Sequence, residues 1–289
     1  METPLVTVLC LCYNQKQFVQ ESIESVINQT YENIELIVMD DGSTDGSQAR
    51  IESLLKKHPQ IKFISHSINQ GYCKTLNEGV ELANGEFIID LAADDILLPK
   101  RVEAGVEALM NLSAGCDIQF TDALLMDEIG KSIGYHSDKF PHYTIPQEDI
   151  YSNLIDRYFI CSPTLMFKKS VVTAIGGYDE TLAFEDFDFL IRASRQFKFC
   201  YSTTPLIKKR MVKTSMSSKQ FVKGSDQRWS TLEVCKKIYK LNKTLAEHAA
   251  LKRRISYEIL LSIRMADLRL AIAFLKFYFR LSSPNTMLL

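Results

Sequence analysis

The chain begins with apolar runs that alternate with segments in which apolar residues recur every three or four positions. The apolar runs cover residues 5–12, 34–39, 61–65 and 87–91. Their length and β-branched content predict buried strands, and the spacing between them, as in Val19, Ile23 and Val26, predicts helices packed on one face. Strand–helix alternation repeated four times predicts an α/β fold with a mostly parallel central sheet flanked by helices, a Rossmann-like arrangement.

Polar and aromatic residues gather where these strands end. Tyr13 follows the first strand, Asp40 and Asp41 the second, Asn69 the third, and Asp94 and Asp95 the fourth. Open parallel sheets bind ligands beyond the carboxyl ends of their strands, so we expect these residues along one edge of the sheet. This gathering is the strongest functional signal that the residues alone provide.

The adjacent carboxylates Asp94 and Asp95 are costly at the end of a buried strand unless a positive charge lies beside them. A divalent cation such as Mg²⁺ or Mn²⁺ meets this need, since it binds through one or two carboxylates and substrate phosphates. A solvated turn that caps the helix beginning near Pro99 explains the same residues. The sequence has neither a G-x-G-x-x-G nor a G-x-x-x-x-G-K-[ST] phosphate loop, so a bound phosphate would need a metal ion or side chains.

A second acidic segment contains Glu185, Asp186 and Asp188 among phenylalanines. The dipole of a helix favours acids in its first turn, and Asp188 is spaced to pair with Arg192. A carboxylate at the boundary of an apolar surface can instead serve as a general base. The basic run 208–213 is strand-like, and a solvated edge and a phosphate contact explain it equally well.

From Asp226 onward the pattern is helical, with Ile255, Ile259 and Ile263 at helical spacing and basic residues in excess. Such helices suit a membrane surface, and they equally suit packing on the first domain or on a second subunit. We therefore expect a domain of residues 1–222 and a helical C-terminal extension of residues 223–289 that serves packing, homodimerisation or peripheral membrane contact.

Composition narrows the class of protein. The net charge of −1 gives no argument for a nucleic-acid partner, and 46% hydrophobic residues in 289 support a substantial core. We find no secretory signal and no apolar run of membrane-spanning length. The seven cysteines form no C-x-x-C pair, which favours a reduced cytoplasmic protein, with the inner face of the membrane as a possible peripheral site.

The order of these motifs resembles the family 2 glycosyltransferases, which have the GT-A fold. The resemblance rests on residues 6–14, 22–31, 35–47, 69–71, 93–99 and 176–186. It extends over roughly residues 3–215 and does not include the C-terminal helices.

The resemblance implies a role for each matching residue. Leu11, Tyr13, Asp40, Asp41, Asn69, Gly71 and Asp94 would bind the nucleotide, with Asp41 on the base, and Asp95 would bind the metal ion. Asp186 would be the catalytic base, supported by Glu185 and Asp188. Many relatives carry a histidine in a Tyr-Arg-x-His motif; this chain lacks it, and Arg210 or Lys213 would compensate.

Together these roles imply an inverting glycosyltransferase that needs Mn²⁺ or Mg²⁺. It would move a sugar from a nucleotide-diphosphate donor, with UDP favoured, to a hydroxyl of a saccharide or lipid-linked acceptor in polysaccharide or glycoconjugate synthesis. Two alternatives remain. A nucleotidyltransferase would need a glycine-rich, basic loop where Cys12–Gln15 stands, and a non-catalytic scaffold would bind nucleotide-sugar without turnover.

Overall fold

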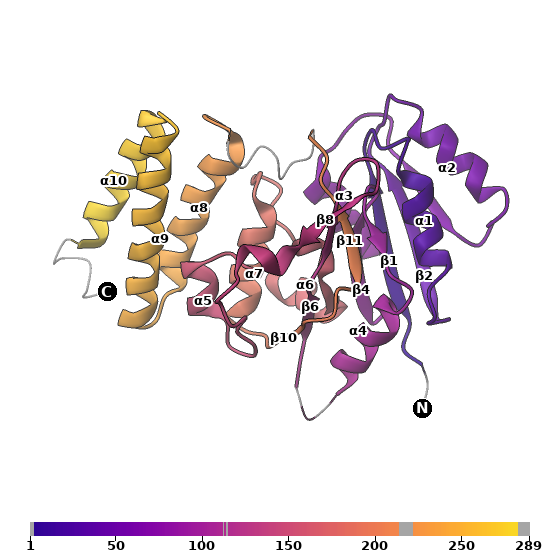
Figure 1. The fold of residues 1–289 in the computed structure, drawn as a ribbon, viewed down its shortest axis with the longest axis horizontal. Helices are drawn as coiled ribbons and strands as arrows, with labels where there is room; N and C mark the ends of the chain where they lie inside the picture. Colours follow the sequence, from indigo (N-terminus) through magenta and orange to yellow (C-terminus); the bar gives the residue numbers. More distant parts are fainter. Residues whose placement is uncertain (1–2, 112, 114, 214–221, 283–289) are drawn as a thin grey trace. The chain divides into compact units, whose positions relative to one another are not determined.

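The computed structural model describes residues 3–111, 113, 115–213 and 222–282, and the chain forms two compact units (Figure 1). The first unit comprises residues 1–148, 160–180 and 197–211, and the second comprises residues 149–159, 181–196 and 212–289. Two segments from the middle of the chain, residues 149–159 and 181–196, therefore belong to the same unit as the C-terminal helices. The division at residue 222 expected from the sequence stays a prediction.

The first unit is built on a seven-stranded sheet with the strand order β10-β6-β9-β4-β1-β2-β3. Its strands are β1 (Val6–Cys12), β2 (Ile34–Asp40), β3 (Lys62–Ser65), β4 (Phe87–Ala92), β6 (Ile118–Thr121), β9 (Met166–Lys168) and β10 (Phe199–Ser202). Only β9 runs against its neighbours β4 and β6. The mostly parallel α/β sheet predicted from the alternating pattern is confirmed.

Helices cover this sheet. They are α1 (Val19–Ile27), α2 (Ser47–Leu55), α3 (Tyr72–Leu82), α4 (Arg101–Met110) and α6 (Lys169–Ile175). The central strand β1 is buried along its whole length because its apolar side chains face helices on alternating sides. Gly79 lets α3 approach closely, since a Cβ there would meet the Met39 Sδ atom at 2.8 Å.

A smaller sheet has the strand order β5-β11-β7-β8. Its strands are β5 (Ile96–Leu97), β7 (Leu124–Met126), β8 (Ser132–Tyr135) and β11 (Ile207–Arg210). The basic run therefore begins in an inner strand, not at a solvated edge. Strand β8 pairs antiparallel with β7, and the 3₁₀ turn η1 (His136–Lys139) follows it.

The segment directly before β9 is not part of the strand ladder. Residues Ser162–Thr164 form the 3₁₀ turn η2, and β9 begins only at Met166. Pro163 has no backbone N–H to donate to a strand ladder, which explains the late start of this strand.

The second unit is helical, as expected for the C-terminal part of the chain. It contains α5 (Tyr151–Asp156), α7 (Glu185–Ser194), α8 (Asp226–Leu241), α9 (Leu245–Arg264) and α10 (Leu268–Ser282). Arg195 joins three of its parts, since it stacks on the Tyr151 ring and donates hydrogen bonds to Glu247 and to the Leu241 carbonyl. Within the described residues, no helix is both long enough and apolar enough to cross a bilayer.

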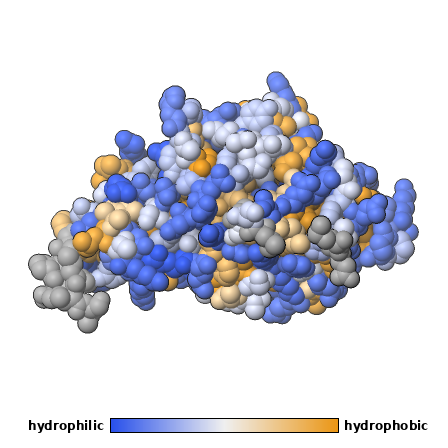
Figure 2. Space-filling model, turned by 90° about the horizontal axis from the view of Figure 1, so that it is seen from below, coloured by the Kyte–Doolittle hydropathy of each residue, from blue (hydrophilic) through white to orange (hydrophobic). Residues whose placement is uncertain are grey.

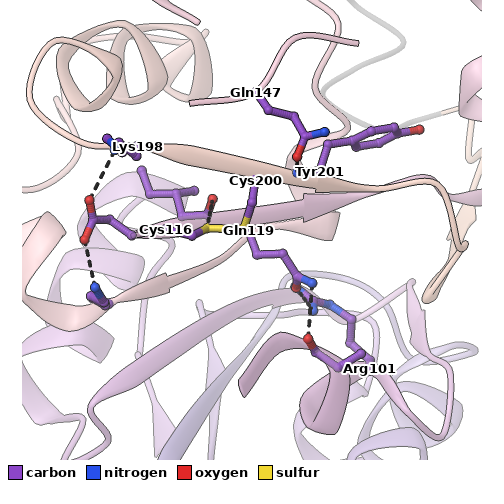
Figure 3. Close-up of a disulfide and its surroundings, with 11 residues drawn as sticks. Arg101, Cys116, Gln119, Gln147, Lys198, Cys200 and Tyr201 are labelled. Carbon is purple, nitrogen blue, oxygen red and sulfur yellow. Dashed lines mark hydrogen bonds and ion pairs between the residues drawn. A yellow bond between two sulfur atoms is a disulfide. The ribbon is translucent and has the colours of Figure 1, made fainter. Parts of the chain in front are cut away.

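A disulfide joins Cys116 to Cys200 in the first unit (Figure 3), which corrects the prediction that all seven cysteines are reduced. The two residues are 84 positions apart in sequence. Cys116 lies just before β6 and Cys200 lies in β10, and the parallel pairing of these strands brings their Cα atoms to 5.9 Å. No short cysteine spacing in the sequence indicates this pair, because only the order of the strands in the sheet brings the two residues together.

Candidate active site

The loops that follow β1 and β2 are joined at the rim of the sheet. The Asn14 N–H donates to Ser43 Oγ at 2.8 Å, and the Asn14 side chain accepts from the Thr44 N–H at 2.8 Å. This arrangement leaves the Tyr13 side chain 49% exposed. Leu11 is buried in β1, and its carbonyl accepts from the Ala93 N–H at 2.9 Å, beside the Asp94–Asp95 pair.

The two aspartates at the end of β2 have different environments. Asp41 accepts hydrogen bonds from the backbone N–H groups of Gln70 and Gly71 at 2.8 and 2.9 Å. Asp40 accepts from the Ser43 N–H at 3.0 Å, and its Oδ1 atom is buried without a hydrogen-bond partner among the described residues. Asp41 thus holds the turn after β3, whereas one oxygen of Asp40 is buried without a hydrogen-bond partner among the described residues.

His66 lies between two carboxylates. Its Nδ1 is 2.9 Å from Asp41 Oδ1, and its Nε2 is 2.9 Å from Glu78 Oε2. An ionised carboxylate only accepts hydrogen bonds, so both contacts are made best when both ring nitrogens carry protons. Burial lowers the pKa of His66, but the two carboxylates outweigh it and raise that pKa above its ordinary value.

The same network acts on Asp41. Burial disfavours its charged form, but hydrogen bonds from Gln70, His66 and Gly71 outweigh this cost and hold the pKa of Asp41 below its ordinary value. His66 and Glu78 were not among the residues predicted from the sequence. The rule that selected the other rim residues would have found His66, because it directly follows β3.

Asp94 and Asp95 are 8% and 3% exposed, at the end of β4. Burial raises the pKa of both, and for Asp95 the negative charge of Asp94 raises it further. The positive charge of Lys209 on β11 opposes these effects at both carboxylates. Two acids in this position are stabilised by an added cation, which is the property expected of a metal-binding pair.

Arg210, at the end of β11, donates hydrogen bonds to both residues of this pair. Its N–H donates to Asp95 Oδ1 at 2.8 Å, and its Nε donates to the Asp94 carbonyl at 3.0 Å. Its Nη2 pairs with Glu21 at 2.7 Å, its Nη1 donates to the Glu128 carbonyl at 3.2 Å, and the guanidinium carbon lies 4.4 Å from the centroid of the Phe18 ring. The guanidinium of Arg210 therefore bonds to protein groups and positions the acidic pair, and no sequence pattern indicated Glu21 or Phe18.

The donor set fits a metal ion that also binds a ligand. Among the described residues, no group of three or more His, Cys, Asp or Glu side chains is arranged to hold a metal ion. The buried Asp94–Asp95 pair could supply only part of the six oxygen ligands that Mg²⁺ or Mn²⁺ prefers. Phosphate oxygens of a bound nucleotide and water would have to supply the others.

The acids of α7 belong to the second unit. Asp188 is buried and paired on both oxygens, with Arg192 at 2.7 Å and with Lys237 at 2.8 Å. The pairing of Asp188 with Arg192 is therefore confirmed. Glu185 is buried, and Asp186 is half-buried at the first turn of the helix.

The remaining predicted residues lie on turns. Asn69 is exposed in the turn after β3, and Gly71 adopts a positive φ of 96° directly before α3. That φ favours glycine, and the Gly71 N–H donates a hydrogen bond to Asp41. Lys213 is exposed and belongs to the second unit, whereas Arg210 belongs to the first.

Solved structures share this fold. S. aureus TarS 1–349 in complex with UDP-GlcNAc has a TM-score of 0.70 at 16% identity, over 96% of this chain and 81% of that one. A mannosyltransferase of Pyrobaculum calidifontis in complex with GDP-Man and Mn²⁺ has a TM-score of 0.64 at 14% identity, over 96% and 88%. At such low identities the similarity shows the fold alone.

Two curated relatives are themselves described as uncharacterized glycosyltransferases. One from Haemophilus influenzae is 44% identical over 100 residues, which are 35% of this chain and 31% of the relative. One from Methanocaldococcus jannaschii is 29% identical over 202 residues, or 69% and 68%. The match thus spans about a third of the first relative's length.

The sheet order, the acidic rim and these similarities agree with a match to the profile of glycosyl transferase family 2 over residues 7–174, more than half of the chain. The chain belongs to glycosyl transferase family 2.

Proposed function

We propose that this chain is a metal-dependent inverting glycosyltransferase that moves a sugar from a UDP-sugar to a hydroxyl of a saccharide or lipid-linked acceptor. The observation that carries the proposal is the buried Asp94–Asp95 pair at the end of β4, beside the rim that holds Asp40 and Tyr13. A function in polysaccharide or glycoconjugate synthesis follows from such an acceptor. The nucleotide-sugar ligands of the structural neighbours support the class of donor.

For the nucleobase, we assign the direct contact to Asp40. Its buried Oδ1 has no hydrogen-bond partner within the described residues, so it can accept a bond from an N–H donor such as that of uracil. Asp41 is already bonded to Gln70, Gly71 and His66, and in this proposal it holds the turn with Asn69 around the base. Tyr13 offers an exposed ring on which the base could stack.

For the diphosphate, Asp95 and Asp94 would hold Mn²⁺ or Mg²⁺. The ion would neutralise and orient the leaving group. Lys209, whose charge acts on both carboxylates, would complement the charge of the phosphate in place of the absent histidine. Arg210 would act by positioning Asp95, and exposed Lys213 stays a candidate for a phosphate contact.

For the acceptor, Asp186 would take the proton of the attacking hydroxyl, as a general base does in an inverting displacement. The two carboxylate oxygens of Asp188 form ion pairs, one with Arg192 and the other with Lys237. Glu185 is more deeply buried than Asp186. Asp186 is the least buried of these three acids, so we assign it the contact with the substrate, and the other two would support it.

Calorimetric titration of UDP, with and without Mn²⁺, tests the proposal. Wild type should bind UDP more tightly with Mn²⁺. Asp95→Asn should lose that gain, and Glu107→Gln, an exposed change on α4, should retain it. Failure of UDP, GDP, CDP and dTDP to bind under either condition would contradict the proposal. Binding without any sugar transfer or donor hydrolysis would favour the scaffold alternative.

A further inference from the structure

The two C-terminal helices keep all their acidic residues inside. Glu247 and Glu258, the acids of α9, and Asp267, in the turn directly before α10, are 7%, 5% and 5% exposed, and the described part of α10 has no acid. Each is bonded within its unit: Glu247 pairs with Arg195, Glu258 pairs with Arg254, and Asp267 accepts from the Gly224 N–H. No carboxylate of these helices is therefore available at the surface.

Basic side chains lie on the exposed surface of α9 and α10. The exposed charged residues of α9 and of the described part of α10 are all basic: Arg253, Arg264, Arg269, Lys276 and Arg280. Arg253 pairs with Asp156 of α5. On α10 the spacing of Arg269, Lys276 and Arg280, by seven and four positions, places them in one row along the helix.

An apolar row runs beside the basic row. Leu268, Ile272 and Phe279 of α10 are 64%, 52% and 67% exposed, again at spacings of four and seven. On α9, Tyr257, Leu260 and Ile263 are exposed to a similar degree. Figure 2 shows apolar and hydrophilic residues intermixed on the surface of the chain. We call the two rows of α10 the basic–apolar face.

We propose that the basic–apolar face binds the surface of an anionic lipid bilayer. Exposed apolar side chains can enter the boundary of the acyl chains, while the adjacent basic row meets anionic head groups. No helix here spans a bilayer among the described residues, so the contact would be peripheral. The inference is independent of the reaction that the first unit catalyses.

A second copy of the chain fits this face less well. A two-fold contact places the same patch on both sides, so Arg269 and Lys276 of one subunit would meet the same basic row of the other. The surfaces of α9 and α10 offer no carboxylate to balance these charges. An anionic bilayer supplies the complementary charge that a second copy lacks.

Co-sedimentation of the full chain with vesicles tests the proposal. One set of vesicles is pure phosphatidylcholine, and the other contains about 30% phosphatidylglycerol. We expect binding only to the anionic set, weakening as salt is raised. The double variant Arg269→Glu/Lys276→Glu should bind about 25-fold more weakly or worse, and Ile272→Ser should also weaken binding.

The control is Lys56→Glu/Lys57→Glu, which changes two exposed lysines of the first unit and alters the net charge equally. It should bind like wild type, and circular dichroism should show that all variants fold. The proposal fails if the wild-type chain does not bind anionic vesicles. It also fails if Arg269→Glu/Lys276→Glu binds these vesicles as tightly as the control Lys56→Glu/Lys57→Glu does. A third outcome would also contradict it. In that outcome, light scattering shows that the wild-type chain is a dimer that does not bind vesicles, and Ile272→Ser dissociates this dimer.

Discussion

At the scale of single residues, the rim depends on how charged groups are paired. His66 touches a carboxylate with each ring nitrogen, at 2.9 Å to both Asp41 and Glu78. Only the protonated ring donates from both nitrogens, so the folded state favours the charged form. The raised pKa of His66 therefore makes the stability of this part of the rim dependent on pH.

We expect this stabilisation to be complete below about pH 6.5, the ordinary pKa of histidine, and to be lost as the pH rises through the raised folded value. Urea unfolding of wild type and His66→Gln at several pH values measures it. The variant should be less stable by about 1–3 kcal/mol at the acidic end, and the difference should shrink at alkaline pH. A difference that does not change with pH would contradict the assignment.

Two acids of one helical turn should respond in opposite ways to mutation. Asp188 is buried between Arg192 and Lys237, so Asp188→Asn should destabilise the fold by about 3–5 kcal/mol. Asp186 is half-buried and is proposed as the base, so Asp186→Asn should lower turnover by about 10²–10⁴-fold and leave UDP binding unchanged.

Thermal unfolding and steady-state transfer assays on both variants separate these effects. Normal turnover by Asp186→Asn would rule out its role as the base. An unfolding temperature for Asp188→Asn equal to that of wild type would show that its two ion pairs contribute little.

At the scale of elements, the edge strand β10 is fixed to the sheet by more than its ladder. Its pairing with β6 is accompanied by the disulfide, and the Tyr201 N–H donates to Gln147 at 3.2 Å (Figure 3). Nearby, the fully buried Arg101 anchors α4 to β6 through a 2.7 Å hydrogen bond to Gln119. These contacts hold the edge of the sheet that lies farthest from β3.

We expect Cys116→Ser to lower the free energy of unfolding by about 2–4 kcal/mol, because the disulfide closes a long loop in the unfolded chain. Differential scanning calorimetry with and without a thiol reductant measures this loss. Reductant should lower the unfolding temperature of wild type to that of the variant and leave the variant unchanged. Equal unfolding temperatures for oxidised wild type and Cys116→Ser would contradict the expectation.

At the scale of the whole molecule, segments distant in sequence form each unit. Residues 149–159 and 181–196 interrupt the first unit and belong to the second with the C-terminal helices. Arg195 illustrates why: its bonds to Glu247 and Leu241 link α7 to helices about 50 residues later. A pattern read along the chain predicts helices at these positions but not the unit that they join.

The sequence by itself determined the strand–helix order, the rim residues at strand ends and the helical C-terminal part. These features follow from periodicity, which depends only on neighbouring residues. Only the tertiary structure decided which carboxylate oxygens of Asp40 and Asp41 have hydrogen-bond partners. It also decided that Arg210 bonds to Asp95 and Glu21, and that Cys116 forms a disulfide with Cys200. Each of these contacts joins residues whose proximity depends on strand pairing and burial, and no local pattern in the chain encodes it.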